Sequence, residues 1–260
     1  MTHDPVLVSR HGGVALVSLN EPDSRNALSR PLVAAIGDVY DELESDESVR
    51  CVVLTGEGRA FCAGAELATL RAAADGDFES VKEVYDGFLR VYRSPLVTIA
   101  AVNGPAVGAG LNLALACDVR LAATRARFDT RFAELRIHPG GGHAWLLARA
   151  VGQQHATMAC LFSEVWDAQA ALNVGLVAAV HDDEHLLGAA ISLGRRLDRQ
   201  EPAFVRRLTA TVRQSLTTAN HVDALADETA AQQWSTTMPA FRAGVRAIEE
   251  RIASTQRSRG

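Results

Sequence analysis

A strand, glycine segment and helix follow one another twice in the first half of the chain, and this repeated unit constrains the fold most. Residues 51–55 and 96–102 are short apolar runs with several β-branched side chains, typical of strands buried on both faces. Each run leads into a glycine-rich segment, residues 56–67 and 103–112, and then into a helical pattern. This order predicts an α/β fold.

Other segments extend the same pattern. Residues 14–19 predict a strand, and Ser29 is placed to cap a helix that has Pro31 in its first turn. After a break at residues 75–77, helical spacing predicts that several large apolar residues are core. They are Val81, Val84, Tyr85, Phe88 and Tyr92. Beyond about residue 182, only helices are predicted, over residues 184–199, 202–216, 221–234 and 239–254.

Composition excludes several classes of protein. With 260 residues, of which 48% are hydrophobic, the chain is long enough to bury a large core. A net charge of −5 with acids and bases interleaved argues against a nucleic-acid partner. No apolar run approaches the ~20 residues of a membrane span, and the start lacks a signal-peptide pattern. Four scattered cysteines without metal-ligand spacing indicate reduced thiols, no metal and a cytoplasmic protein.

The two glycine segments supply unpaired backbone N–H groups. The first N–H groups of a helix lack intrahelical acceptors, and the helix dipole adds partial positive charge there. The N–H groups of Ala65 and Ala109, each before a predicted helix, therefore fit the two halves of an oxyanion hole. The alternative is that the glycines only permit close packing of helix on strand. Neither segment matches a phosphate-binding or dinucleotide-binding glycine motif.

Several motifs together resemble the crotonase, or enoyl-CoA hydratase/isomerase, superfamily over nearly the whole chain. The strongest are GRAFCAGAEL at residues 58–67 and AVNGPAVGAG at residues 101–110, followed by ACD at residues 116–118. Further matches are RF at residues 127–128, PGGG at 139–142, AALNVGLV at 170–177 and GVRAIEER at 244–251.

The resemblance implies a spiral of ββα units with a C-terminal helical trimerisation region, divided as a core of residues 1–200 and a helical region of residues 201–260. It implies an acyl-CoA ligand of fatty acid metabolism, lyase or isomerase chemistry, no cofactor besides coenzyme A as part of the substrate, and a homotrimer or homohexamer. Ala65 and Ala109 would hold the thioester oxygen. The substrate-binding residues that it implies are Arg25, Ala27, Leu28, Ala63, Gly64, Glu66, Leu67, Ala68, Gly108, Gly110, Pro139, Gly140, Ile248 and Arg251. For Arg251, a solvated charge on the last helix is the alternative.

The chain departs from the family pattern at the catalytic acids. Hydratases of this family hold a water between two glutamates, and the matching positions here are Asn112 and Phe132. An amide can orient water but cannot take its proton, and a phenyl ring can do neither. Some isomerases place an acid directly after the proline of the PGGG motif, where this chain has Gly140. Ordinary hydration is therefore disfavoured.

Other titratable residues are candidates for the missing acid or base, each with a structural alternative. Glu134 can be a surface or ion-paired carboxylate, Asp129 can have a structural or solvent role, and Cys62 can be a buried structural thiol without a partner base. Asp118 fits a structural acceptor at a helix end. His138 and His143 bracket the PGGG loop, where a histidine can be either a base or a packing residue.

Three functions follow as hypotheses. The first is an acyl-CoA-processing enzyme that stabilises a thioester enolate with an unusual base or none. The second is a non-catalytic fatty acyl-CoA-binding protein, and the third is an oligomeric scaffold.

Overall fold

A computed structural model describes residues 4–257, and the chain divides into two compact units between Asp198 and Arg199. The first unit contains the sheets and both glycine segments, and the second contains helices α8 (Pro202–Ser215), α9 (His221–Thr236) and α10 (Pro239–Arg257). Among the described residues, no helix combines the length and apolar character needed to cross a bilayer.

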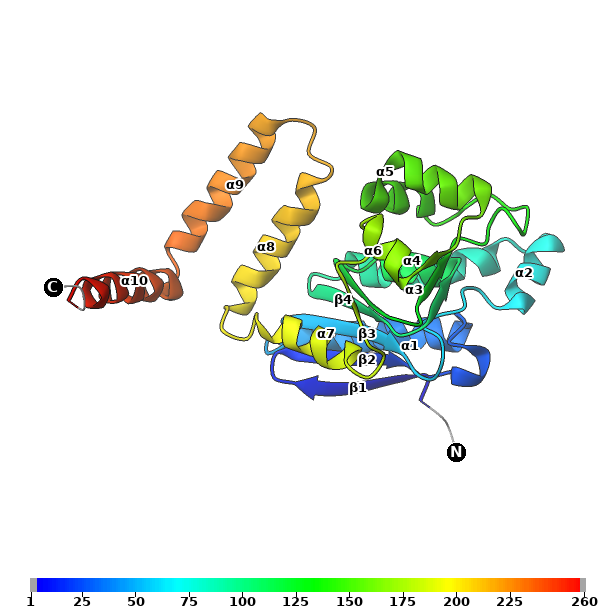
Figure 1. Ribbon diagram of the computed structural model, residues 1–260, viewed down its shortest axis with the longest axis horizontal. Coiled ribbons are helices and arrows are strands. Elements are labelled where there is room, and N and C mark those ends of the chain that lie inside the picture. The colour runs from blue at the N-terminus through cyan, green and yellow to red at the C-terminus, as the bar shows by residue number, and fades with distance from the viewer. Residues whose placement is uncertain (1–3, 258–260) are drawn as a thin grey trace. The chain divides into compact units, whose positions relative to one another are not determined.

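The first unit is built on a main sheet with the strand order β1–β2–β3–β4–β6–β9 (Figure 1). The strands are β1 (Val6–His11), β2 (Val14–Leu19), β3 (Cys51–Gly56), β4 (Val97–Val102), β6 (Val119–Ala123) and β9 (Ala179–His181). The hairpin of β1 and β2 is antiparallel, and all later neighbours pair in parallel. The predicted strands at residues 14–19, 51–55 and 96–102 are therefore adjacent.

Both faces of this sheet are covered, which explains the continuous apolar runs. Val14, Cys51 and Val53 pack in one cluster with Leu186 and Ala190 of α7 (Leu186–Arg195). The alternating residues on the same strands face the larger core. That core also includes residues of α1 (Arg30–Ser45), α3 (Glu79–Arg93), α4 (Ala109–Leu115), α5 (His143–Phe162) and α6 (Ala168–Asn173). Parallel sheets have packed elements on both faces, so their strands carry apolar side chains on both sides.

A small second sheet of β5 (Pro105–Val107), β7 (Arg127–Asp129) and β8 (Trp166–Asp167) includes part of the second glycine segment as its strand β5. A short 3-10 helix η1 (Pro22–Ser24) and helix α2 (Leu67–Ala74) complete the first unit. These two elements flank the first glycine segment and the loop before α1, so they border the candidate site described below.

Most of the expected elements are confirmed, with one correction in the core. Ser29 caps α1, because its side chain accepts a hydrogen bond from Leu32 N. On α3, Val84 and Phe88 are buried, whereas Val81 and Tyr85 are half-buried. The prediction that Tyr92 is core is wrong, since this side chain is 39% exposed. The buried face of α3 ends at Val91, and the next residue points away from it.

Candidate active site

The first glycine segment runs alongside β5, which is part of the second segment. Phe61 N and Cys62 N both donate to Pro105 O, and Val107 N donates to Cys62 O at 3.0 Å. This backbone pairing, between residues more than 40 positions apart in the sequence, brings the region around Gly64 beside the start of α4.

Glycine is required where the two segments touch. A Cβ atom on Gly64, whose φ is +95°, would lie 2.6 Å from Val107 O and 3.5 Å from Ala109 N. A Cβ atom on Gly110 would lie 2.1 Å from Cys62 O. The distances to Val107 O and Cys62 O are shorter than van der Waals separation, so any larger residue would push the segments apart. The glycines thus serve the close approach that the sequence left as an alternative to ligand binding, and both roles are compatible.

The N–H groups of Ala65 and Ala109 lie at this junction. Ala65 directly precedes Glu66, the N-cap of α2, and Ala109 is the first residue of α4. Within residues 4–257, neither N–H donates a hydrogen bond to another atom of the chain. Two unused donors at adjacent helix starts are the components that an oxyanion site needs.

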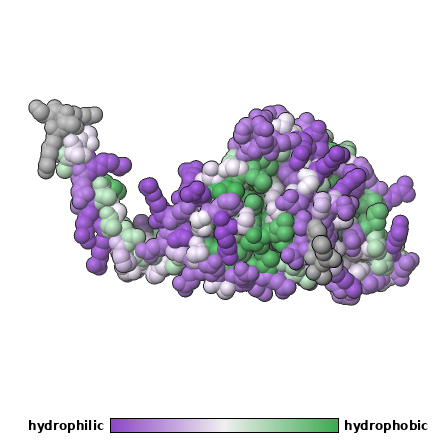
Figure 2. All heavy atoms as spheres, turned by 90° about the horizontal axis from the view of Figure 1, so that it is seen from below, coloured by the Kyte–Doolittle hydropathy of each residue, from purple (hydrophilic) through white to green (hydrophobic). Residues whose placement is uncertain are grey.

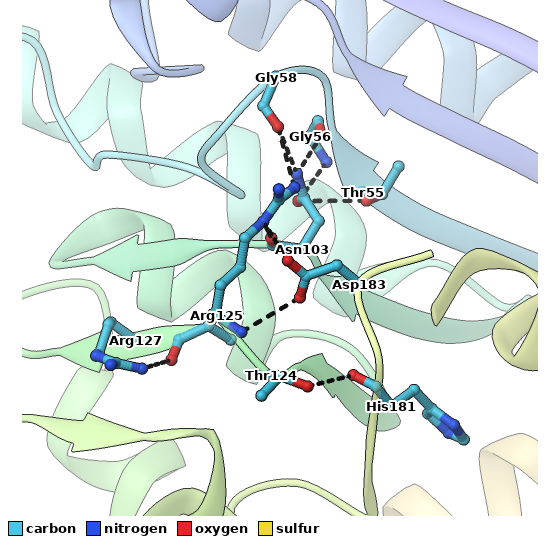
Figure 3. A network of polar contacts seen from close by, with 10 residues as sticks. Thr55, Gly56, Gly58, Asn103, Thr124, Arg125, Arg127, His181 and Asp183 are labelled. Atoms are coloured by element: carbon cyan, nitrogen blue, oxygen red, sulfur yellow. Dashed lines mark hydrogen bonds and ion pairs between the residues drawn. The ribbon is translucent and has the colours of Figure 1, made fainter. Parts of the chain in front are cut away.

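A polar network holds together the first residues of the two glycine segments, Gly56 and Asn103 (Figure 3). The Asn103 side chain donates to Gly56 O at 2.7 Å and accepts from Gly56 N at 3.2 Å. Arg125 Nε donates to Asn103 O at 2.6 Å, and the Arg125 side chain is paired with Asp183. The end of β3 is thereby held to the end of β4, so the two loops that follow start from fixed positions.

The predicted coenzyme A contacts from the loop before α1 lie beside the first segment. Ala63 N donates to Arg25 O, and Leu28 N donates to Gly64 O at 2.7 Å. The buried Asn26 side chain holds the loop in place by donating to Glu57 O and Ala60 O. Leu28 also lines a groove of about 270 Å³ between α1, α2 and α3.

The remaining predicted contacts are spread over three other places. Gly108 and Gly110 are at the start of α4, and Pro139 and Gly140 belong to the glycine loop before α5. Glu66, Leu67 and Ala68 begin α2, where the Leu67 side chain is exposed. Ile248 and Arg251 are exposed residues of α10 in the second unit. Their roles toward coenzyme A remain predictions.

The positions of the two missing glutamates meet at one histidine. His143, the first residue of α5, places Nδ1 2.5 Å from Asn112 Oδ1. The Phe132 ring packs edge-on against the same imidazole, with ring centroids 4.9 Å apart. Asn112 is 2% exposed and His143 is 1% exposed. The structure therefore brings Asn112 and Phe132 together, as the family pattern implies, but around an imidazole.

The other candidate acids and bases have structural partners or ordinary surroundings. Glu134 and Asp129 both pair with Arg131, and Glu134 Oε2 lies 3.1 Å from its guanidinium. Burial raises the pKa of the Cys62 thiol to about 12, which keeps it protonated and unreactive near neutral pH. Asp118 accepts hydrogen bonds from Thr98 N and Oγ1, which confirms its structural role. His138 is exposed, with Nδ1 2.7 Å from Pro139 O.

The fold and the site together define a class of proteins in which two glycine segments follow neighbouring parallel strands and touch one another. The family model for enoyl-CoA hydratase/isomerase matches residues 9–256, and the chain belongs to this family, the crotonase superfamily.

Curated relatives and solved structures agree. A probable enoyl-CoA hydratase, EchA14 of Mycobacterium tuberculosis, is 42% identical over 253 residues, which cover 96% of this chain and 99% of the relative. The 1,2-epoxyphenylacetyl-CoA isomerase of Escherichia coli is 36% identical over 74% of this chain and 75% of its own. The crystal structure of an enoyl-CoA hydratase from Bacillus anthracis has a TM-score of 0.89 at 29% identity, covering 95% and 96% of the two chains. The named relatives are hydratases and isomerases of CoA thioesters.

Two features of the site were not found from the sequence. His143 borders the PGGG loop, but its position in the sequence does not separate a base from a packing residue. The Asn103 and Arg125 network was not expected either. A polar residue at the end of an apolar strand was the signal for Asn103, whereas Arg125 carries no local signal.

Proposed function

We propose that this protein binds an acyl-CoA thioester and holds its carbonyl oxygen with the N–H groups of Ala65 and Ala109. The observation that supports this most is the proximity of two unused N–H donors, since Ala65 follows Gly64 directly and a Cβ atom on Gly64 would lie 3.5 Å from Ala109 N. As negative charge develops on the oxygen, each donor stabilises the enolate more than the starting thioester. Loss of one such donor typically raises the barrier by ~2.7 to 4 kcal/mol.

The proposed chemistry is atypical for the family, because the usual acids are absent at positions 112 and 132. Asn112 can donate and accept hydrogen bonds without moving a proton, and Phe132 makes the acyl pocket more apolar. Each general acid or base contributes ~10² to 10⁴ in rate, so hydration should be slow. Reactions that need mainly enolate stabilisation, such as double-bond isomerisation or decarboxylation, fit the site better.

Coenzyme A contacts form the second part of the proposal. The loop containing Arg25, Ala27 and Leu28 lies against residues 63–65, so a ligand whose thioester is at Ala65 passes this loop. Arg251 would reach a phosphate of the nucleotide from another subunit of a trimer. Trimer or hexamer formation suits the many apolar side chains exposed on the second unit, among them Leu208, Val212 and Leu225. Figure 2 shows a further apolar patch in the middle of the face that it draws.

The absence of both usual glutamates also favours a second candidate, a fatty acyl-CoA-binding protein without turnover. Such a protein would retain the oxyanion hole because its hydrogen bonds contribute to the affinity for acyl-CoA. An oligomeric scaffold is the third candidate, supported by the exposed apolar side chains alone. Binding of acyl-CoA excludes the scaffold, and turnover of an enoyl-CoA separates the enzyme from the binding protein.

Isothermal titration with butyryl-CoA and with its thioether analogue, S-butyl-CoA, tests the hole without altering the protein. The thioether lacks the carbonyl oxygen but keeps the chain and the nucleotide. Two lost hydrogen bonds of ~0.5 to 1.5 kcal/mol each predict roughly 5- to 150-fold weaker binding of the thioether. Equal affinities would contradict the assignment of Ala65 and Ala109. Absence of any binding by butyryl-CoA would overturn the proposed function itself.

A further inference from the structure

The imidazole of His143 is the one histidine side chain among residues 4–257 that combines burial with a directed partner and an unused nitrogen. Nδ1 contacts Asn112 Oδ1, and Nε2 is buried without a hydrogen-bond partner in the described part of the chain. An unpaired buried acceptor is unfavourable in a folded protein, and such groups are frequent at functional sites.

The hydrogen bonds around Asn112 determine which nitrogen holds the proton. Asn112 Nδ2 donates to Gly140 O at 3.2 Å, and a carbonyl can only accept, so the amide oxygen must face His143. That oxygen can only accept as well, so Nδ1 of His143 carries the hydrogen. In the neutral ring, Nε2 is then left with a bare lone pair.

The surroundings keep the ring neutral. Burial lowers the pKa of His143 to about 4. The groups packed on it are uncharged, namely Asn112 from α4 and Phe132 from the segment after β7. From α3, the Tyr85 hydroxyl packs against the glycine loop at Gly140, and burial raises its pKa. Both titratable groups are therefore uncharged near neutral pH.

We propose that His143 Nε2 is the proton acceptor of this site and the single base of a double-bond isomerisation, an inference that rests on the proposed acyl-CoA function. His143 contacts both positions at which hydratases of the family have acids, Asn112 through Nδ1 and Phe132 through the ring, so the imidazole lies where the family pattern implies the proton-transfer groups. Asn112 is the positioning residue that fixes the tautomer.

The step balances with one base. The α-C–H bond of a 3-enoyl thioester breaks, and its proton forms a bond to Nε2. The electron pair enters the conjugated enolate, whose oxygen is held by Ala65 and Ala109. The imidazolium then returns the proton to the γ-carbon, which gives the 2-enoyl thioester. Hydration, in contrast, also needs a water held for attack on the β-carbon, and Phe132, at one of the two positions that hold this water in hydratases of the family, offers it no hydrogen bond.

The imidazolium that forms is paired with the enolate made in the same step. Although burial disfavours a charged ring in the empty site, the two charges arise together and attract one another. A base of low pKa can therefore act here, because the step creates no net charge in the pocket.

The test uses 3-hexenoyl-CoA as the substrate and follows formation of the conjugated thioester, with butyryl-CoA binding measured on the same preparations. His143→Gln removes the base but keeps a polar side chain, and isomerisation should fall by ~10²-fold or more with butyryl-CoA affinity nearly unchanged. His138→Gln, an exposed histidine of the same loop region, is the matched control and should leave the rate unchanged. A His143→Gln variant that isomerises at the wild-type rate would overturn the proposal.

A second variant separates a base from a packing residue and is informative even if His143→Gln misfolds. Asn112→Asp keeps the shape of the side chain, removes the hydrogen bond to Gly140 O and puts a carboxylate on Nδ1–H, which stabilises the imidazolium and raises the pKa of His143. Because only the neutral ring accepts a proton, the acid limb of the kcat/KM profile should move to higher pH. An unchanged profile contradicts the proposal. Wild type that binds butyryl-CoA without isomerising 3-hexenoyl-CoA overturns this inference alone, whereas loss of binding overturns the proposed function with it.

Discussion

The backbone half and the side-chain half of the site differ in how they are held. In the backbone half, Ala65 and Ala109 are placed by main-chain pairing and by glycines at positions where a Cβ atom would clash. In the side-chain half, Asn112, Phe132 and His143 are placed by ordinary packing and two hydrogen bonds. The positions of the N–H donors therefore depend little on side chains, whereas the other half of the site consists of side chains.

This difference explains how a family can keep one reactive feature and vary another. Sterics at Gly64 and Gly110 preserve the N–H positions as long as the fold is retained. The groups that move protons can change by substitution without disturbing the sheet, because positions 112, 132 and 143 lie outside the main strands. The hole is thus the constant part of the proposed mechanism, and the base is the variable part.

Restoring the usual acids should give the largest effect. The double variant Asn112→Glu/Phe132→Glu supplies two carboxylates for water, and crotonyl-CoA hydration should rise by about 10²- to 10⁴-fold over wild type. Initial rates of hydration measure this gain. The variant Asn112→Gln/Phe132→Gln is the matched control, since it adds polar side chains of similar size without a base. Wild type that already hydrates as fast as the glutamate variant would show that our interpretation of these positions is wrong.

The burial of His143 should appear in the pH dependence of stability. Its pKa is about 4 in the folded chain and ~6.5 in the unfolded chain, so the unfolded state binds more protons between these values. The contribution of His143 to the free energy of unfolding should therefore be fully present above pH 6.5. The free energy of unfolding should fall by about 3 kcal/mol as the pH drops to 4. Urea unfolding at several pH values measures this loss. His143→Gln should lose less than wild type over the same interval, and equal losses would argue against a buried neutral imidazole.

The backbone half is tested through its glycines. Gly110→Ala places a Cβ against Cys62 O, and overpacking of this kind destabilises by ~1 to 3 kcal/mol or more. Gly37→Ala is the control, because nothing lies within 4 Å of its Cβ and it is inside α1. That change should stabilise by ~0.5 to 1 kcal/mol. Thermal unfolding compares the two variants. Similar shifts in Tm would contradict the claim that a Cβ atom at position 110 clashes with Cys62 O.

Much of the fold could be predicted from local pattern, and less of the site. Strands such as residues 51–55 and the helix capped by Ser29 carry strong local signals, whereas β5, β7 and β8 are two or three residues long and depend on tertiary pairing. The glycine segments predict Ala65 and Ala109 as the two N–H donors, and their role toward a ligand stays a prediction. The contact between Asn112 and His143 spans 31 positions and depends on how α4 and α5 pack, which no local pattern contains.

A crystal structure of the protein with bound butyryl-CoA tests the central claim most directly. We expect the thioester oxygen within ~2.7 to 3.1 Å of both Ala65 N and Ala109 N, with His143 Nε2 the nearest basic atom to the α-carbon. A thioester oxygen that contacts neither N–H group would contradict the oxyanion hole. An α-carbon nearest to a carboxylate such as Glu134 would contradict the assignment of the base.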